Sequence, residues 1–225
     1  MLYVVRHGRT AANASGLLLG HLDPDLDDLG ARQARLVAAA LGPMDRVVSS
    51  PLARTRQTAE AFGIEVEVDD RWIEMDYGEF DGRPVAEIPA ETWAAWRADL
   101  NWAPPGGESH RDLGIRVRAA MDDLFDVSRV SDVAVVTHVS PVKAALAWTL
   151  GVGDELAWRT YVAPASVMVI GAGPAGPSLR NFNDIAHLAA GGASSGQEFS
   201  GVQIMDCCHH PVQHLADQLH GPIVD

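Results

Sequence analysis

The sequence predicts an α/β fold in which a mainly parallel central sheet carries helices on both faces and a small helical cap insertion. Short apolar segments alternate along the chain with amphipathic ones, which is the pattern of strand–helix–strand units. The apolar segments at 2–5 and 133–136 are continuous and rich in β-branched residues, which is typical of strands buried on both faces. The Ser-Pro pairs at 50–51 and 140–141 follow apolar segments directly and indicate helix starts.

The alternation places each element in order along the chain. Strands are expected at residues 2–6, 46–49, 64–68, 133–137 and 166–170. Helices are expected at residues 28–41, 52–62, 84–99, 109–125 and 140–150.

Local start and stop signals support these helices. The helix at 28–41 follows Asp27 and ends near Gly42, as an N-cap carboxylate and a terminal glycine require. In the Ser-Pro pairs at 50–51 and 140–141, the serine is expected to cap the helix and the proline to take its first position.

The expected catalytic domain covers residues 1–187. Its segment 72–110 is rich in tryptophan and proline, and we interpret it as a cap insertion that excludes water and shapes a leaving-group pocket. The alternative is that its tryptophans only pack the insertion onto the sheet. Residues 188–225 begin with a Gly/Ser-rich linker and are expected to form a flexible or weakly docked tail without catalytic duty.

Composition narrows the class of function. The 225 residues carry a formal net charge of −13, with 30 acidic against 17 basic residues, which argues against a nucleic-acid partner. No apolar run is long enough for a membrane span, and Met1 leads directly into the first strand. A cytoplasmic protein without a membrane partner is therefore expected.

The cysteine and histidine pattern of the tail does not predict a metal site. Cys207 and Cys208 are adjacent, so no disulfide framework is available. They stand near several histidines, but the spacing lacks the two-residue gaps of familiar zinc sites.

The chemistry is concentrated where the strands end. Arg6, His7 and Gly8 follow the first strand, and ligands bind at the carboxyl ends of strands in such sheets. A guanidinium fork suits phosphate oxygens, while a neutral imidazole can attack phosphorus. Taken alone, the same three residues also fit a strand that ends in a surface arginine and a capped histidine.

Two further junctions agree with an anion site. His138 follows the strand at 133–137 beside the start of a helix, where the helix dipole favours anions, although a buried histidine bonded to backbone is the alternative. Arg54 falls in the first turn of a helix, where a cation is disfavoured unless something negative lies opposite it. Arg56 is expected to face solvent.

Taken in order, these motifs resemble the histidine phosphatase superfamily, in its phosphoglycerate-mutase-like phosphatase branch. The resemblance runs from about residue 2 to about residue 185. It rests on Arg6-His7-Gly8 with Thr10 and Asn13, the run from Ser49 to Ala59 with Arg54, the segment Glu74 to Gly82, Gly106-Gly107-Glu108-Ser109, and Val136-Thr137-His138.

The resemblance implies a role for each matching residue. His7 matches the nucleophile that becomes a phosphohistidine, and Arg6, Arg54 and His138 match the phosphate pocket. Glu74 matches the carboxyl group that handles the proton, with Glu79 as its rival. Asn13 matches an accessory phosphate contact, and Gly8 and Thr10 belong to the same substrate-binding motif. No cofactor or metal is implied.

Two departures from the family pattern concern the pocket. Arg9 stands where an acidic residue is usual, and it is expected either to be a solvated rim residue or to add positive charge at the pocket mouth. Val139 and Ser140 stand where small glycines are frequent, which narrows the pocket and leaves the catalytic side chain intact.

The expected function is a metal-independent phosphatase of the histidine acid phosphatase type, acting on a small phosphorylated metabolite, with a homodimer left open. One alternative is a mutase of the phosphoglycerate type. The 64 residues that separate Glu74 from His138 (138 − 74) are compact beside the long insertion of cofactor-dependent mutases, which favours the phosphatase. The other alternative is a catalytically silent binding protein of the same fold.

Overall fold

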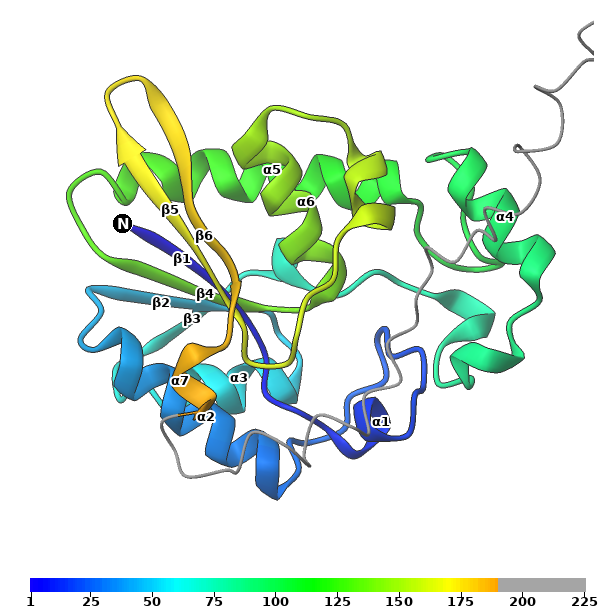
Figure 1. The fold of residues 1–225 in the computed structure, drawn as a ribbon, viewed down its shortest axis with the longest axis horizontal. Helices are drawn as coiled ribbons and strands as arrows, with labels where there is room; N and C mark the ends of the chain where they lie inside the picture. Colours follow the sequence, from blue (N-terminus) through cyan, green and yellow to red (C-terminus); the bar gives the residue numbers. More distant parts are fainter. Residues whose placement is uncertain (190–225) are drawn as a thin grey trace, which may run out of the picture.

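The computed structural model describes residues 1–189, which fold around one six-stranded sheet of order β3-β2-β4-β1-β5-β6 (Figure 1). The first four strands of this order run parallel, whereas β5 and β6 are antiparallel to their neighbours. The mainly parallel sheet predicted from the sequence is thereby confirmed. The strands are β1 (Leu2–Arg6), β2 (Arg46–Ser49), β3 (Val66–Val68), β4 (Val133–Thr137), β5 (Val167–Gly173) and β6 (Gly176–Asp184).

Helices cover both faces of the sheet. In Figure 1, α5 and α6 lie on one face, and α2 and α3 lie on the other. The helices are α1 (Ala11–Ala14), α2 (Asp28–Leu41), α3 (Ala53–Glu60), α4 (Ala90–Ala98), α5 (His110–Val127), α6 (Val139–Leu150) and α7 (Ala186–Ala189). Short 3-10 turns span Asp70–Trp72, Gly78–Phe80, Val85–Glu87 and Asp154–Arg159. No helix within residues 1–189 has the length and apolar character needed to cross a membrane.

The central strands explain the continuous apolar segments of the sequence. Every residue of β4 is buried, and successive side chains point to opposite faces. Val133 and Val135 join the core under α5 and α6, whereas Ala134 and Val136 join the core under α2 and α3. A strand covered on both faces has no polar side to show in its sequence.

The two Ser-Pro helix starts were predicted wrongly. His138 is the N-cap of α6, which begins at Val139, so Pro141 lies in the first turn, where its missing N–H leaves no intrahelical bond unmade. Leu52 is the N-cap of α3, and its side chain makes no capping bond. The physical reason is that the Ser50 hydroxyl contacts the imidazole of His138 and does not cap the helix.

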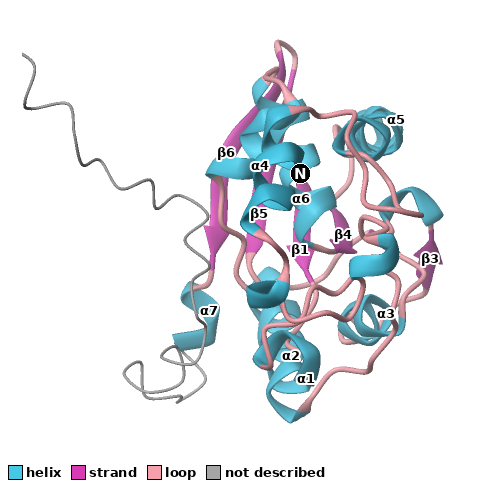
Figure 2. Cartoon of the chain, turned by 90° about the vertical axis from the view of Figure 1, so that its right-hand side faces the viewer, coloured by secondary structure: helices cyan, strands magenta, loops and turns pink. Residues whose placement is uncertain are grey.

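The continuous helix expected at 84–99 is also corrected. Pro89 is the N-cap of α4, which spans only Ala90–Ala98, and a separate 3-10 turn covers Val85–Glu87. Proline disfavours helical geometry in the residue before it, and Ile88 is accordingly extended. In Figure 1, α4 lies beyond the end of the sheet toward which β1 runs, and Figure 2 views the molecule from that side, with α4 toward the viewer.

Three elements were not predicted at all. Strand β6 lies at the sheet edge and none of its residues is fully buried, so it lacks an apolar signature. Helices α1 and α7 contain four residues each, too few to show a helical period. The Gly/Ser-rich linker and the cysteine–histidine segment lie outside the described residues.

Candidate active site

Two buried imidazoles meet at the carboxyl ends of neighbouring strands. His7 follows β1 and His138 follows β4, and these strands pair in parallel. The ring centroids of His7 and His138 lie 5.1 Å apart, with the ring planes at 62°. The exposed fractions are 3% for His7 and 0% for His138. The prediction that the two remote histidines come together is confirmed.

The surroundings of His7 hold its imidazole neutral and fix its orientation. Burial, followed by the charges of Arg6 and Arg54, lowers the pKa of His7 well below 6.5. Its Nδ1 lies 2.6 Å from the carbonyl oxygen of Gly8, which makes Nδ1 the protonated nitrogen. The lone pair is then on Nε2, the atom that can attack an electrophile. The amide of Gly8 donates to the Thr58 hydroxyl at 3.1 Å and holds the loop in place.

His138 is held by a residue whose role the sequence did not reveal. The Ser50 Oγ lies 2.7 Å from His138 Nε2, joining the end of β2 to the end of β4. When Ser50 donates this bond, the proton of the imidazole is on Nδ1. Burial and the charge of Arg54 lower the pKa of His138 well below 6.5.

Two buried guanidiniums belong to the same site. Arg54 is fully buried and donates from Nη1 to Leu22 O and from Nη2 to Gly20 O, each at 2.7 Å. Arg6 donates from Nη1 to Val162 O at 2.7 Å. Within residues 1–189, Arg6 Nε, Arg54 Nε and His138 Nδ1 are buried and have no hydrogen-bond partner. A buried donor without a partner costs about 1–3 kcal/mol, and a bound anion would remove that cost.

Glu74 is the buried carboxyl group beside these residues. Its exposed fraction is 3%, and it lies against the N-terminus of α6. Its Oε1 accepts from the amides of Met75 at 2.8 Å and Ser140 at 3.1 Å, and its Oε2 accepts from the amide of Val139 at 3.1 Å. The amides of Val139 and Ser140 would otherwise lack partners at the start of α6. Glu79 is exposed and does not line the cavity described below.

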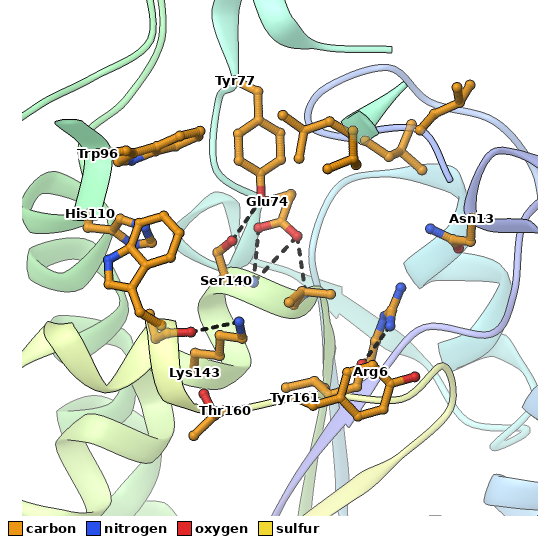
Figure 3. Close-up of a pocket in the computed structure, with 18 of the residues that line it drawn as sticks. Arg6, Asn13, Glu74, Tyr77, Trp96, His110, Ser140, Lys143, Thr160 and Tyr161 are labelled. Carbon is orange, nitrogen blue, oxygen red and sulfur yellow. Dashed lines mark hydrogen bonds between the residues drawn. The ribbon is translucent and has the colours of Figure 1, made fainter. Parts of the chain in front are cut away.

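Asn13 is positioned by a capping box at the start of α1. Its Oδ1 accepts from the backbone amide of Thr10 at 3.1 Å, and the Thr10 hydroxyl bonds to the same oxygen at 3.0 Å. Because Oδ1 faces the helix cap, the amide nitrogen of Asn13 is directed toward the cavity (Figure 3). Thr10 itself is fully buried and serves as the N-cap.

A cavity of about 410 Å³ opens in front of these groups. Of the residues singled out from the sequence, Arg6, His7, Asn13 and Glu74 line it. Gly8, Thr10, Arg54 and His138 do not line it. Gly8 and His138 contact His7, Thr10 bonds to Asn13, and the charge of Arg54 lowers the pKa of His7. In the cap segment Trp93 and Trp96 line the cavity, whereas Trp72 is fully buried in the core.

Sequence reasoning missed one whole wall of the cavity. Residues 157–162 line it, together with Tyr77, His110, Ser140 and Lys143. Three bonds fix this wall: Lys143 Nζ donates to Ala157 O at 2.8 Å, Arg6 to Val162 O, and the amide of Ala163 to Asn183 Oδ1 at 2.7 Å. The one available signal was the run Trp158-Arg159-Thr160-Tyr161, whose aromatic and polar side chains stand outside the apolar strand pattern.

The two departures from the family pattern lie at different places. Arg9 pairs with Asp27 through Nε and Oδ2 at 2.8 Å, and its side chain is 34% exposed, so it does not line the cavity. Ser140 does line the cavity, and its Oγ lies 3.0 Å from the Tyr77 hydroxyl. Among residues 1–189, no group of three or more His, Cys, Asp or Glu side chains is arranged to hold a metal ion.

Comparison with known proteins identifies the family. The family profile of the histidine phosphatase superfamily (branch 1) matches residues 2–185. A putative phosphoserine phosphatase of Hydrogenobacter thermophilus is 30% identical over 196 residues, covering 83% of this chain and 96% of that protein. A bifunctional protein of Mycobacterium tuberculosis is 34% identical over 178 residues, which cover 75% of this chain and 49% of that relative, so the chain spans about half of its length.

Solved structures agree with the family profile. The mycobacterial glucosyl-3-phosphoglycerate phosphatase in complex with VO3 is 31% identical to this chain. It superposes with a TM-score of 0.73, over 82% of this chain and 98% of that structure. The α/β architecture and the resemblance drawn from the ordered motifs are both confirmed.

Proposed function

This chain belongs to the histidine phosphatase superfamily (branch 1), and we propose from that premise that it hydrolyses phosphomonoesters of small metabolites through a phosphohistidine on His7. The observation that carries the proposal is the buried pair His7–His138, of which His7 lines the cavity beside Arg6, while the charge of Arg54 acts on both imidazoles. Related proteins named as phosphoserine and glucosyl-3-phosphoglycerate phosphatases support a small phosphorylated metabolite as substrate.

The first half of the reaction transfers the phosphoryl group to the enzyme. His7 Nε2 attacks phosphorus in line with the ester oxygen, so that an N–P bond forms as the P–O ester bond breaks. Arg6, Arg54 and His138 stabilise the charge on the phosphoryl oxygens through the buried donors that otherwise lack partners. Glu74, protonated at the start, gives its proton to the leaving alkoxide.

The second half releases inorganic phosphate. Glu74, now a carboxylate, takes a proton from a water molecule whose oxygen attacks phosphorus. The N–P bond breaks, the electron pair returns to His7 Nε2, and the site regains its starting protonation. In this half the amides of Val139 and Ser140 donate to the Glu74 carboxylate and hold it at the start of α6.

A single-turnover experiment tests the intermediate. Labelled p-nitrophenyl phosphate should transfer phosphate to the wild-type protein as an acid-labile, base-stable adduct, and His7→Ala should lose both the adduct and the release of phosphate. Retained turnover in His7→Ala would refute the assignment. Glu74→Gln should slow the reaction strongly, whereas Glu79→Gln, which removes an exposed carboxylate, serves as its matched control.

The wild-type protein can also be tested for mutase activity, in which the phosphoryl group is transferred from His7 back to the product and not to water. When 3-phosphoglycerate is followed by phosphorus NMR, we expect free phosphate to appear. Interconversion of the 2- and 3-isomers without free phosphate would assign a mutase instead. The acid phosphatase type, the homodimer and the cytoplasmic location stay predictions from the sequence.

A further inference from the structure

The cavity extends well beyond the groups that would hold a phosphate. In Figure 3, Arg6 and Asn13 lie at one end, while His110, Lys143 and Thr160 lie at the other. Phosphoryl transfer uses only the first end. The second end is built from α5, α6 and the 157–162 wall, and the proposed function assigns it no role.

The side chains that line the cavity include more cations than acids, whereas the protein as a whole is acidic. The chain carries a formal net charge of −13 and contains one lysine, Lys143. Yet among the described residues that line the cavity, Arg6, Lys143 and Arg159 are cationic, and Glu74 is the one acid. A cation that is rare in the sequence and faces a substrate cavity favours an anionic ligand over a neutral one.

Lys143 is held at the wall of this second end. It belongs to α6, and its Nζ donates to Ala157 O at 2.8 Å, so the ammonium is fixed where the 157–162 wall begins. The neighbouring acid Asp154 forms a bidentate pair with Arg118 at 2.6 and 2.9 Å, so its charge is already matched.

His110 adds a neutral donor beside this ammonium. Burial, followed by the charge of Lys143, lowers the pKa of His110 to about 4, so it carries no charge near neutral pH. It packs edge-on against Trp158, with ring centroids 4.9 Å apart. Its side chain makes no hydrogen bond to other residues within 1–189, although only 7% of it is exposed. One N–H of a neutral imidazole thus stands near the ammonium of Lys143, while Arg159 of the 157–162 wall is exposed.

We propose that Lys143 and His110 bind a carboxylate on the leaving group of the substrate, which makes phosphorylated hydroxy acids the preferred esters of this enzyme. The inference rests on the proposed phosphatase function and names the substrate class of that same site. An ammonium and a neutral donor on neighbouring walls suit a carboxylate, whereas the dianionic phosphoryl group is assigned to the site of Arg6 and Arg54. The apolar side chains of Leu17, Val85 and Trp93 line the cavity and suit the carbon skeleton.

The test compares two esters that differ only in the group Lys143 would bind. 3-Phosphoglycerate carries a carboxylate where glycerol 3-phosphate carries a hydroxymethyl group. We expect the wild-type kcat/KM to favour 3-phosphoglycerate by about 10- to 100-fold, the range of a hydrogen bond to a charged group. Lys143→Met keeps the length of the side chain and should lower this ratio at least tenfold. Arg32→Met removes one exposed charge from α2 and should leave the ratio as it is.

The outcomes separate this inference from its premise. A wild-type ratio near one, or an unchanged ratio in Lys143→Met, overturns the carboxylate subsite while the phosphatase stands. Hydrolysis of p-nitrophenyl phosphate without hydrolysis of either natural ester also overturns the carboxylate subsite and leaves the phosphatase function in place. If no ester is hydrolysed by the wild-type protein, the premise fails and the inference with it. Retention of the ratio in Lys143→Arg would confirm that the positive charge, and not the packing of α6, selects the substrate.

Discussion

At the scale of single residues, the site couples charge and nucleophilicity through burial. Arg6 and Arg54 prepare the site for a phosphate, and the same two charges help to keep the imidazole of His7 unprotonated. An imidazole in water would be half protonated near pH 6.5 and would then have no lone pair on the attacking nitrogen. The two guanidiniums that we propose to bind the phosphate therefore also help to keep the proposed nucleophile, His7, neutral before a substrate binds.

This coupling predicts the acid limb of the pH profile. Because the pKa of His7 is lowered, its imidazole stays neutral as the pH falls from 8 through 6.5, and kcat/KM corrected for ionisation of the ester should stay constant over that range. Arg6→Gln removes one of the charges that lower the pKa, so the titration of His7 should move to higher pH. The titration of His7 in both proteins can be followed by NMR of its imidazole resonances, with Arg32→Met as the control for net charge.

A titration of wild-type His7 near 6.5 would contradict this prediction. So would an Arg6→Gln protein whose His7 titrates at lower pH than the wild type, since removal of a nearby positive charge can only favour the protonated imidazole.

At the scale of elements, α5 holds the loop that carries Glu74, the proposed proton donor. Arg116 on α5 donates from Nη1 to Arg71 O and Ile73 O, each at 2.7 Å, and from Nη2 to Glu74 O at 3.2 Å. Glu108 accepts from Arg116 at 2.7 and 2.8 Å and orients the guanidinium. One side chain thereby holds three carbonyls of the loop that carries Glu74.

Loss of these three bonds from Arg116 should slow the transfer of the phosphoryl group to His7 most for esters whose leaving group needs a proton. We expect Arg116→Lys to lower kcat/KM, which reports this transfer, by about 10- to 100-fold for an alkyl phosphate, the equivalent of one or two lost charge-assisted hydrogen bonds. Its effect on p-nitrophenyl phosphate should be much smaller, because nitrophenolate leaves without being protonated. Arg118→Lys is the matched control, since Arg118 lies on the same helix and pairs with Asp154. Equal losses on both esters would mean that Arg116 acts on the fold alone.

The close packing of α2 against the loop that follows His7 leads to a second prediction at this scale. A Cβ on Gly30 would lie 2.0 Å from the carbonyl oxygen of Arg9, so Gly30→Ala must displace α2 or the loop that follows His7. We expect it to lower the free energy of unfolding by about 1–3 kcal/mol, as overpacking typically does, and to lower activity as well. Gly173→Ala, whose Cβ would meet its nearest atom at 3.8 Å, should change neither property. Urea unfolding and phosphate release measure the two effects.

At the scale of the whole molecule, the features that depend on short sequence patterns and on the order of the elements could be predicted from the sequence. The buried strands, the helix capped by Asp27 and the convergence of His7 with His138 could be predicted, because each follows from a short pattern or from the rule that parallel strands end together. The 157–162 wall could not be predicted, since its place depends on bonds to Lys143, Arg6 and Asn183, which are distant in sequence. Strand β6 was missed because an exposed edge strand has no apolar alternation.

The same burial that prepares the site should make the whole fold sensitive to acid. His7, His110 and His138 all have a pKa lower in the folded chain than the 6.5 of an unfolded one, so the unfolded state binds more protons as the pH falls below 6.5. The stability that these three neutral imidazoles contribute is therefore fully present above pH 6.5 and is lost as the pH falls below 6.5. For His110 the loss continues down to its pKa of about 4 in the folded chain.

For His110 alone, this linkage amounts to about 1 kcal/mol between pH 7 and pH 5.5. Urea unfolding at the two pH values should show a wild-type loss of at least that size. His110→Phe keeps an aromatic ring against Trp158 and should reduce the loss by about 1 kcal/mol. An equal loss in wild type and His110→Phe would show that His110 binds its proton as readily in the folded chain as in the unfolded one. The side chain assigned as a neutral donor at the second end of the cavity would then be a cation. The carboxylate subsite as proposed would be wrong.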